Sequence, residues 1–79
     1  MTIQNSISWH DLLDGFPPEN SLCLCKVSHE EMAVTDYRIC FYGKKPGCLV
    51  GKRFWMFDLL ITNVERYAVL ETDYNYFKR

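Results

Sequence analysis

The most regular hydrophobic pattern of the chain runs from Thr35 to Tyr42. Every second residue of this stretch is aromatic or β-branched, and this set comprises Thr35, Tyr37, Ile39 and Phe41. The residues between them are Asp36, Arg38, Cys40 and Tyr42. A period of two residues is typical of a strand with one buried face, and aromatic and β-branched side chains suit a pleated surface. We therefore expect a strand over 34–42, with the first set facing the core.

Two further stretches have the pattern of strands. Residues 22–27 alternate two leucines and a lysine with two cysteines and a valine. A polar loop at 28–31 separates them from 34–42, which predicts an antiparallel hairpin. Residues 64–70 predict a last strand, in which Tyr67 and Val69 share one face.

The stretch 48–61 has large apolar residues at both alternating positions. Such a pattern fits either a central strand covered on both faces or a buried helix, and Gly51 together with the bulky aromatic residues favours the strand. The preceding Pro46-Gly47 suits the centre of a type II turn.

Residues 8–16 have the signature of a short helix. Ser8 suits the N-cap position, and Asp11 three residues later completes a capping-box-like pair. Apolar residues recur at the spacing of one helical stripe, at Trp9, Leu12, Leu13 and Phe16. Gly15 and the following Pro17-Pro18 end the helix. Together these elements predict an α+β fold, in which a short N-terminal helix packs on a mainly antiparallel sheet of three or four strands.

The length of 79 residues predicts a single domain over 1–79. The net charge of −1 favours neither nucleic acid nor a membrane surface, although residues 1–42 carry a net −4 and residues 43–79 a net +3. The longest apolar runs, at 54–57 and 59–61, are far shorter than a membrane span. With no secretory signal pattern at the N-terminus, we expect a cytoplasmic protein without membrane contact.

Four cysteines raise the question of a metal site. Structural zinc sites draw their thiolates as pairs two to four residues apart in tight knuckles. Cys23 and Cys25 lie one residue apart within a strand, and Cys40 and Cys48 lie on separate segments. We therefore expect core thiols, no metal and no cofactor, with zinc binding by these four residues as a weaker alternative.

No motif of this chain predicts catalysis. The stretch from His29 to Ala33 begins like a zinc-protease helix but has Ala33 in place of the second histidine. Residues 43–47 lack the length and the trailing Lys-Ser/Thr of a phosphate loop. We therefore expect a protein that is not an enzyme.

Four cations beside aromatic residues suggest nucleic-acid binding as one hypothesis. Single-strand binders combine cations for phosphates with rings for base stacking. The candidate set is Lys44, Lys45, Lys52, Arg53 and Trp55. The competing interpretation is that the cations solubilise a loop while the rings fill the core.

The C-terminal tail has three aromatic residues, Tyr74, Tyr76 and Phe77, without an obvious core position. Aromatic side chains are enriched at protein interfaces because they offer a large contact area with few rotatable bonds. We expect these rings, with Tyr67 beside them, to form or border a partner surface, which includes a homodimer contact. The alternative is that the tail folds back over Trp55 and Phe57.

Both ends of the chain resemble a small domain family of unknown function found in tailed phages and prophages. Its members open W-I-S-V-x-D-x-L-P, enter a strand of the type V-L-V and close with H-W-M-P-L-P. The matching stretches here are Ile7 to Leu13, Phe16 to Asn20, Leu22 to Leu24 and Arg66 to Leu70. Ser6 replaces the leading Trp, 14–16 are inserted, and Tyr67 and Val69 stand for the closing Trp and Pro. The resemblance implies a phage or mobile-element origin and a small β-rich fold.

Three functional hypotheses follow. The first is a non-enzymatic protein-binding accessory module, encoded by a phage or mobile element, that modulates or inhibits a host protein or defence complex in the host cytoplasm. The second is a single-stranded nucleic-acid-binding module that uses the region from Lys44 to Trp55. The third is a module stabilised by a metal held by the four cysteines.

Overall fold

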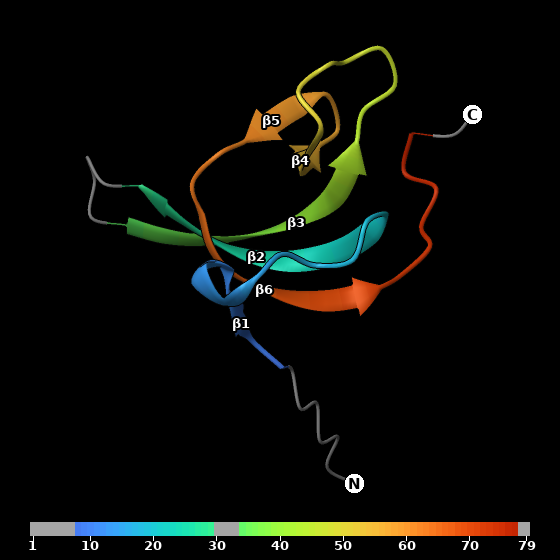
Figure 1. Cartoon of the computed structure of the whole chain (residues 1–79). Helices are drawn as coiled ribbons and strands as arrows, with labels where there is room; N and C mark the ends of the chain where they lie inside the picture. Colours follow the sequence, from blue (N-terminus) through green and yellow to red (C-terminus); the bar gives the residue numbers. More distant parts are fainter. Residues whose placement is uncertain (1–7, 30–33, 78–79) are drawn as a thin grey trace, which may run out of the picture.

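The computed structural model describes residues 8–29 and 34–77. These residues form a six-stranded, antiparallel sheet with the strand order β1-β6-β2-β3-β4-β5. The strands are β1 (His10–Asp11), β2 (Ser21–His29), β3 (Val34–Lys44), β4 (Lys52–Met56), β5 (Leu59–Ile61) and β6 (Val64–Glu71). Strands β4 and β5 curl away from the plane of β2, β3 and β6 (Figure 1).

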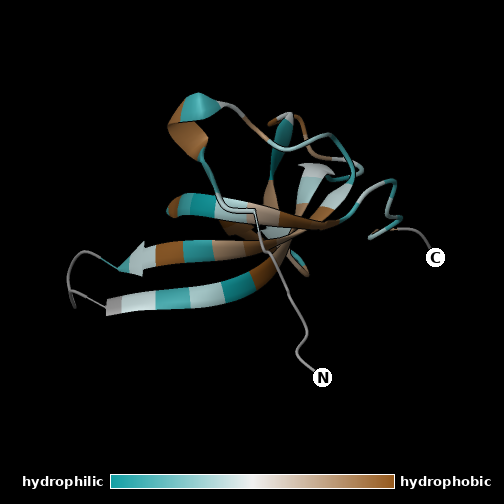
Figure 2. Ribbon diagram, turned by 90° about the horizontal axis from the view of Figure 1, so that it is seen from below, coloured by the Kyte–Doolittle hydropathy of each residue, from teal (hydrophilic) through white to brown (hydrophobic). Residues whose placement is uncertain are grey.

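The expected hairpin is confirmed. Strands β2 and β3 pair from Ser21↔Tyr42 to His29↔Val34, and they extend together past the rest of the sheet (Figure 2). The last strand is also confirmed, and β6 returns to pair with β2 on the side opposite β3. The expected polar loop at 28–31 is only partly described, because 30 and 31 lie outside the described residues.

The predicted α+β fold is wrong, because the segment at 8–16 contains no α-helix. His10 and Asp11 form β1, which pairs with Tyr67 and Arg66 of β6. Only a single 3₁₀ turn follows, η1 (Leu12–Asp14), whose N-cap is Asp11 and not Ser8. Asp11 Oδ1 accepts a hydrogen bond from the Leu13 N–H at 3.0 Å, and Gly15 ends the turn at φ 137°. Pairing at the sheet edge leaves too few residues before Gly15 for a helix to propagate.

The stretch 48–61 is neither one central strand nor a helix. It contains the two short strands β4 and β5, which pair as an antiparallel hairpin closed by Phe57 and Asp58. Periodicity did not show this turn, because Phe57 is bulky and apolar and still occupies a positive φ of 58°. A position of this kind normally favours Gly, Asn or Asp.

One face of the sheet holds the main core and carries three buried thiols; we call it the thiol face. Its buried residues are Cys23, Cys25, Val27, Cys40, Tyr42, Phe54 and Tyr67. Leu12, Ile61, Val64 and Val69 pack against them. The core therefore includes Tyr67 and Val69 on one face, as the sequence predicts.

The predicted inward set of β3 is wrong at three of its four positions. Thr35, Tyr37 and Ile39 are exposed, and only Phe41 is buried. Cys40 and Tyr42 face the core instead, because they lie opposite Cys23 and Ser21 on the thiol face. The apolar alternation identified the strand but not the side on which the core forms.

The opposite side of the sheet has a smaller buried cluster under the C-terminal tail; we call it the tail face. Phe41 and Trp55 lie opposite each other on β3 and β4 and are both buried. The Trp55 Nε1–H donates to the Gly43 carbonyl oxygen at 3.2 Å. A Cβ at Gly43 would lie 2.7 Å from the Phe41 ring, so a larger residue there would push this ring aside.

Candidate functional site

The tail rings pack on the tail face. Tyr76 stacks on Phe41 with 5.1 Å between ring centroids, and Phe77 meets Phe41 edge-on at 5.4 Å. Phe77 also meets Trp55 edge-on at 6.2 Å. The Tyr76 hydroxyl accepts a hydrogen bond from the Phe57 N–H at 2.7 Å. The tail therefore covers Trp55, as the alternative interpretation expects, but it contacts Phe57 through the backbone N–H, and the Phe57 side chain stays 76% exposed.

The four residues predicted to bind a partner do not lie together. Tyr74 and Tyr76 are 6.2 Å apart by ring centroids, and Phe77 adjoins Tyr76. Tyr67, in contrast, is buried on the thiol face, where its hydroxyl donates to the Gly15 carbonyl oxygen at 3.2 Å. Partner binding by any of the four residues stays a prediction.

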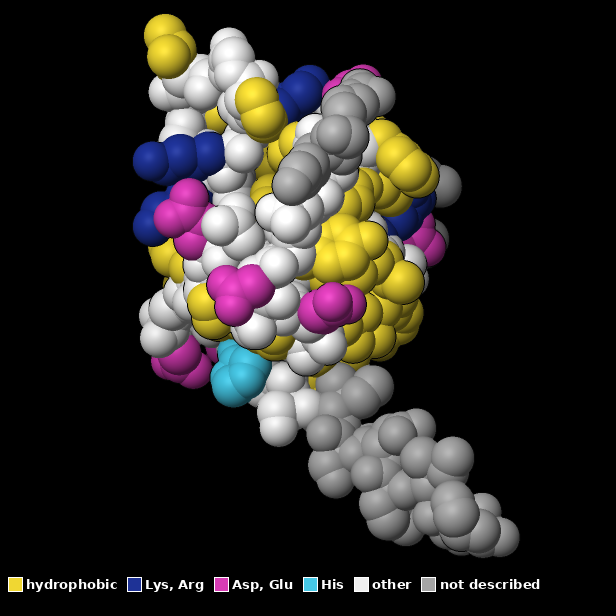
Figure 3. Space-filling model, turned by 90° about the vertical axis from the view of Figure 1, so that its right-hand side faces the viewer, with side chains coloured by type: hydrophobic (Ala, Val, Ile, Leu, Met, Phe, Trp, Pro, Cys, Tyr) yellow, Lys and Arg dark blue, Asp and Glu magenta, His cyan; other side chains and the backbone are white. Residues whose placement is uncertain are grey.

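Beyond the tail rings, the tail face continues as an apolar surface over β2, β3 and β6. Ile39, Leu24 and Ala68 form one row across these strands, as their register shows. Tyr37 is 59% exposed and Ile39 53% exposed, and Trp9 contacts the Tyr37 ring at 5.9 Å. Figure 3 views the molecule from the side where the C-terminal segment lies and shows hydrophobic side chains gathered over much of that side.

Cations border this apolar row. Lys26 lies opposite Tyr37 on β3 and opposite Arg66 on β6. Lys26 also pairs with Glu65, with 3.9 Å between Nζ and Oε1. The tail face thus has an apolar centre and a polar border, which is the usual anatomy of a protein interface.

The five residues of the nucleic-acid hypothesis lie on β3, β4 and the loop between them, but their one ring is buried. Trp55 is 3% exposed, so its ring faces cannot stack on a base in this arrangement. Lys45 lies 5.3 Å from the Trp55 ring centroid and pairs with Asp58 at 3.2 Å. Lys44 lies opposite Lys52 in the β3–β4 register, and Lys52 and Arg53 line a pocket. The candidate set therefore has no exposed ring for base stacking.

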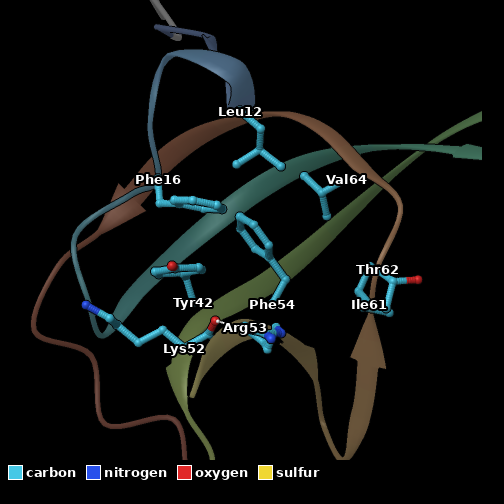
Figure 4. Close-up of a pocket in the computed structure, with 9 residues that line it drawn as sticks. All are labelled: Leu12, Phe16, Tyr42, Lys52, Arg53, Phe54, Ile61, Thr62 and Val64. Carbon is cyan, nitrogen blue, oxygen red and sulfur yellow. Dashed lines mark hydrogen bonds between the residues drawn. The ribbon is translucent and has the colours of Figure 1, made fainter. Parts of the chain in front are cut away.

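That pocket opens at the edge of the thiol face and has a volume of about 590 Å³ (Figure 4). The segment at 12–16 forms one wall and the β4–β5 hairpin another. The sequence indicated Lys52 and Arg53 as functional candidates, but it gave no signal for a pocket, because its walls come from segments distant in the chain.

The thiols of Cys23, Cys25 and Cys40 are fully buried, and Cys48 lies partly exposed in the β3–β4 loop. Burial, and secondarily the charge of Cys40, raises the pKa of Cys23 to about 12. Interaction with the neighbouring Cys40 thiol, and secondarily burial, raises the pKa of Cys25. Interaction with Cys25 lowers the pKa of Cys40, against the effect of burial.

Within residues 8–29 and 34–77, no group of three or more His, Cys, Asp or Glu side chains is placed to hold a metal ion. All four cysteines are free thiols. The structure therefore brings three of the four proposed zinc ligands into one core without forming a ligand cluster, and metal binding by the four cysteines stays a prediction.

A small charged cluster lies at the far end of the β2–β3 hairpin. Asp36 Oδ2 lies 3.1 Å from His29 Nε2 and 3.2 Å from Arg38 Nη2. The Arg38 hydrogen bond, followed by that of His29, lowers the pKa of Asp36. All three side chains are partly exposed, so the cluster resembles a surface ion-pair network more than a buried catalytic site.

No family model matches the chain, and neither a curated protein nor a solved structure matches it. The resemblance to a phage family therefore stays a prediction. The described part of the chain contains no helix long and apolar enough to cross a membrane.

Proposed function

We propose that this protein is a protein-binding module and that its partner covers the tail face. The observation that carries the proposal is the exposure of Tyr37 and Ile39, at 59% and 53%. These residues belong to the most regular apolar alternation of the sequence, a pattern normally found on a buried sheet face. No described segment of the chain covers them fully. A partner protein would supply that cover.

The surroundings of these two residues support a protein rather than a nucleic acid as the partner. The row of Ile39, Leu24 and Ala68 is uncharged, and the aromatic rings beside it already pack against each other. Affinity at protein interfaces concentrates in apolar and aromatic residues near the centre, with polar residues at the rim. The cations Lys26 and Arg66 lie at the border of the apolar row, where an interface has its polar rim.

The partner proposed on the basis of the phage-family resemblance is a host protein or defence complex. A small module of this kind would modulate or inhibit its target by occupying a surface, because no catalytic constellation is evident in its sequence. A second copy of the chain is the other partner to consider, since an apolar sheet face can be self-complementary.

The test compares binding by three forms of the immobilised protein, using lysate of the native host. The double variant Tyr37→Thr and Ile39→Thr places β-branched residues, which suit a strand, at both positions while it removes the apolar surface. Leu13→Ser is the matched control, because Leu13 is equally apolar and 94% exposed but lies on η1. Each captured protein is then purified, and its affinity is measured by titration calorimetry.

We expect the double variant to lose at least tenfold in affinity for the captured protein, and Leu13→Ser to bind as the parent does. Equal affinity of all three forms would refute the tail face as the binding surface. Sedimentation of the parent and the double variant at several concentrations tests whether the protein forms a homodimer. A homodimer through the tail face requires that the parent associates and that the double variant does not.

A further inference from the structure

The pocket on the thiol face is separate from the tail face. Its apolar walls are formed by Leu12, Phe16, Tyr42, Phe54, Ile61 and Val64. They come from the 3₁₀ segment, β3, β4, β5 and the start of β6, so the folded sheet assembles a concave site from distant parts of the chain (Figure 4). A volume of about 590 Å³ is in the range of small-molecule sites.

Aromatic contacts hold one side of the pocket in place. The Phe16 ring stacks on Tyr42 with 5.7 Å between centroids and an interplanar angle of 14°. Tyr42 in turn contacts Phe54 at 4.9 Å. Phe16 remains 66% exposed, because one side of its ring faces the opening of the pocket and solvent. This wall offers a flat apolar surface that a ligand would bury.

The two charged groups at the pocket are both cationic, and Thr62 is a neutral polar residue of its lining. Lys52 and Arg53 line it, and neither makes an ion pair with an acid within residues 8–29 and 34–77. The Arg53 guanidinium donates one hydrogen bond, from Nη1 to the Lys52 carbonyl oxygen at 2.9 Å, which leaves its other N–H groups available. Glu19 is close enough to affect the Tyr42 hydroxyl but does not line the pocket.

From this combination we infer that the pocket binds a small amphipathic anion, with an aromatic or alkyl body against the apolar walls and an acidic head group at Lys52 or at Arg53. The head group is a carboxylate or a phosphate monoester, because a guanidinium and an ammonium pair with either. A neutral ligand of the same shape would gain the apolar contacts but not the charge contacts. Such binding would be independent of the partner surface on the tail face.

The experiment uses 8-anilinonaphthalene-1-sulfonate, a fluorescent aromatic anion, as the probe. Competition with decanoate and decyl phosphate tests the anionic head group, and decanol is the neutral control. We expect both anions to displace the probe at concentrations at least tenfold below decanol, and this difference to shrink as salt is added. The relative potency of decanoate and decyl phosphate identifies the preferred head group.

The double variant Lys52→Gln and Arg53→Gln should weaken probe binding at least tenfold. Lys44→Gln is the matched control, because Lys44 lies directly opposite Lys52 on β3 and does not line the pocket. The Tyr37→Thr and Ile39→Thr variant should bind the probe unchanged, since its substitutions are on the tail face. Phe16→Ala should weaken the probe and both anions alike by removing one wall.

Amide chemical shifts locate the bound decanoate. Shifts at Phe16, Ile61 and Val64 support the inference. Shifts confined to the tail face would overturn it, as would equal displacement by decanol or undiminished binding to the Lys52 and Arg53 double variant. Folding of each variant is checked by the dispersion of the same amide spectrum.

Discussion

Cysteine is the smallest apolar side chain of the thiol face, and three cysteines lie on β2 and β3 at its centre. Cys23 lies directly opposite Cys40, and Tyr67 of β6 lies opposite Cys25. Small residues at these positions leave room for the rings of Tyr42, Phe54 and Tyr67. The thiols are thus explained by packing alone.

Burial and the raised pKa of Cys23 predict selective thiol chemistry. Thiolates are the reactive species, and the Cys23 pKa of about 12 leaves few of them at pH 8. Cys25 and Cys40 are inaccessible as well. We expect the native protein to react rapidly with an alkylating reagent at Cys48 only, and at all four cysteines in denaturant. Mass mapping after a short pulse tests this, and rapid native labelling of Cys25 would contradict the packing described.

Asp36 provides a pH-dependent prediction at the same scale. Its carboxylate is stabilised in the folded state, chiefly by Arg38, so its pKa is lowered. The resulting stabilisation is present above the pKa of the unfolded chain, about 3.9, and is lost as pH falls through the lower folded-state pKa. Because the pair is exposed, the gain in stability should be small.

A carbon-detected NMR titration of the Asp36 carboxyl should therefore show a midpoint below that of an ordinary aspartate. Arg38→Gln should raise this midpoint towards the ordinary value. Lys26→Gln is the control, because Lys26 pairs with Glu65 on another part of the sheet. An unchanged midpoint in Arg38→Gln would show that the ion pair does not persist in solution.

At the scale of single elements, the β4–β5 turn has a strained backbone at Phe57. Phe57 has a φ of 58° and is 76% exposed, so it has a left-handed backbone with little burial in return. That conformation costs a non-glycine residue about 1–2 kcal/mol. Phe57→Asn should raise stability by about 1 kcal/mol, because Asn tolerates this region, and raise the melting temperature by roughly 4–8 °C.

Phe57→Val is the opposing variant, since a β-branched side chain tolerates positive φ least. It should lower the melting temperature, which is measured by circular dichroism. The Phe57 N–H that bonds to the Tyr76 hydroxyl is present in both variants, so the tail contact does not confound the comparison. A lower melting temperature for Phe57→Asn would show that the turn is not strained in solution.

The tail is the second element with a clear energetic expectation. Phe77 packs on Phe41 and Trp55 and is half-buried. Phe77→Ala should cost about 1–2 kcal/mol, less than truncation of a fully buried ring. The melting temperature should fall by roughly 5–15 °C. Phe77→Leu is the control and should retain most of the stability; no change in Phe77→Ala would mean that the tail does not cover the sheet in solution.

The three longest strands were predictable from the sequence, but the helix that the sequence predicted at 8–16 does not form. The alternation at 22–27, 34–42 and 64–70 identified β2, β3 and β6, because a period of two is a local property. The signals at 8–16 were local as well, but pairing of His10 and Asp11 with β6 overrode them. No local pattern reveals that contact, since β6 lies at the other end of the chain.

The same limit applied to the candidate site. From the sequence, Lys52 and Arg53 were candidates for nucleic-acid binding and the tail rings were candidates for partner binding. In the structure, the two cations line the pocket and the tail rings pack on the tail face. The sequence did not reveal which face of β3 is covered. Near Phe41 and Tyr42, both alternating sets contain large apolar residues. That choice depends on the 3₁₀ segment and the tail, which cover opposite faces of the sheet.

At the scale of the whole molecule, the two clusters share their strands. Tyr42 and Phe54 belong to the thiol face, while their chain neighbours Phe41 and Trp55 belong to the tail face. A strand cannot leave one cluster and remain in the other. Strand β2 adds to this coupling, since it pairs with β3 on one side and with β6 on the other. The sheet should therefore unfold as one unit.

We expect a single transition in urea, followed with one probe on each face. Trp55 fluorescence reports on the tail face in a Trp9→Phe background, and pulsed alkylation of Cys23, Cys25 and Cys40 reports on the thiol face. The two curves should coincide in midpoint and in slope, as two-state unfolding of a small domain requires. Phe77→Ala should shift both midpoints equally, although it alters only the tail face. Should Trp55 become exposed at a lower urea concentration than the thiols, the tail face would be a separately unfolding layer, and the shared-strand argument would fail.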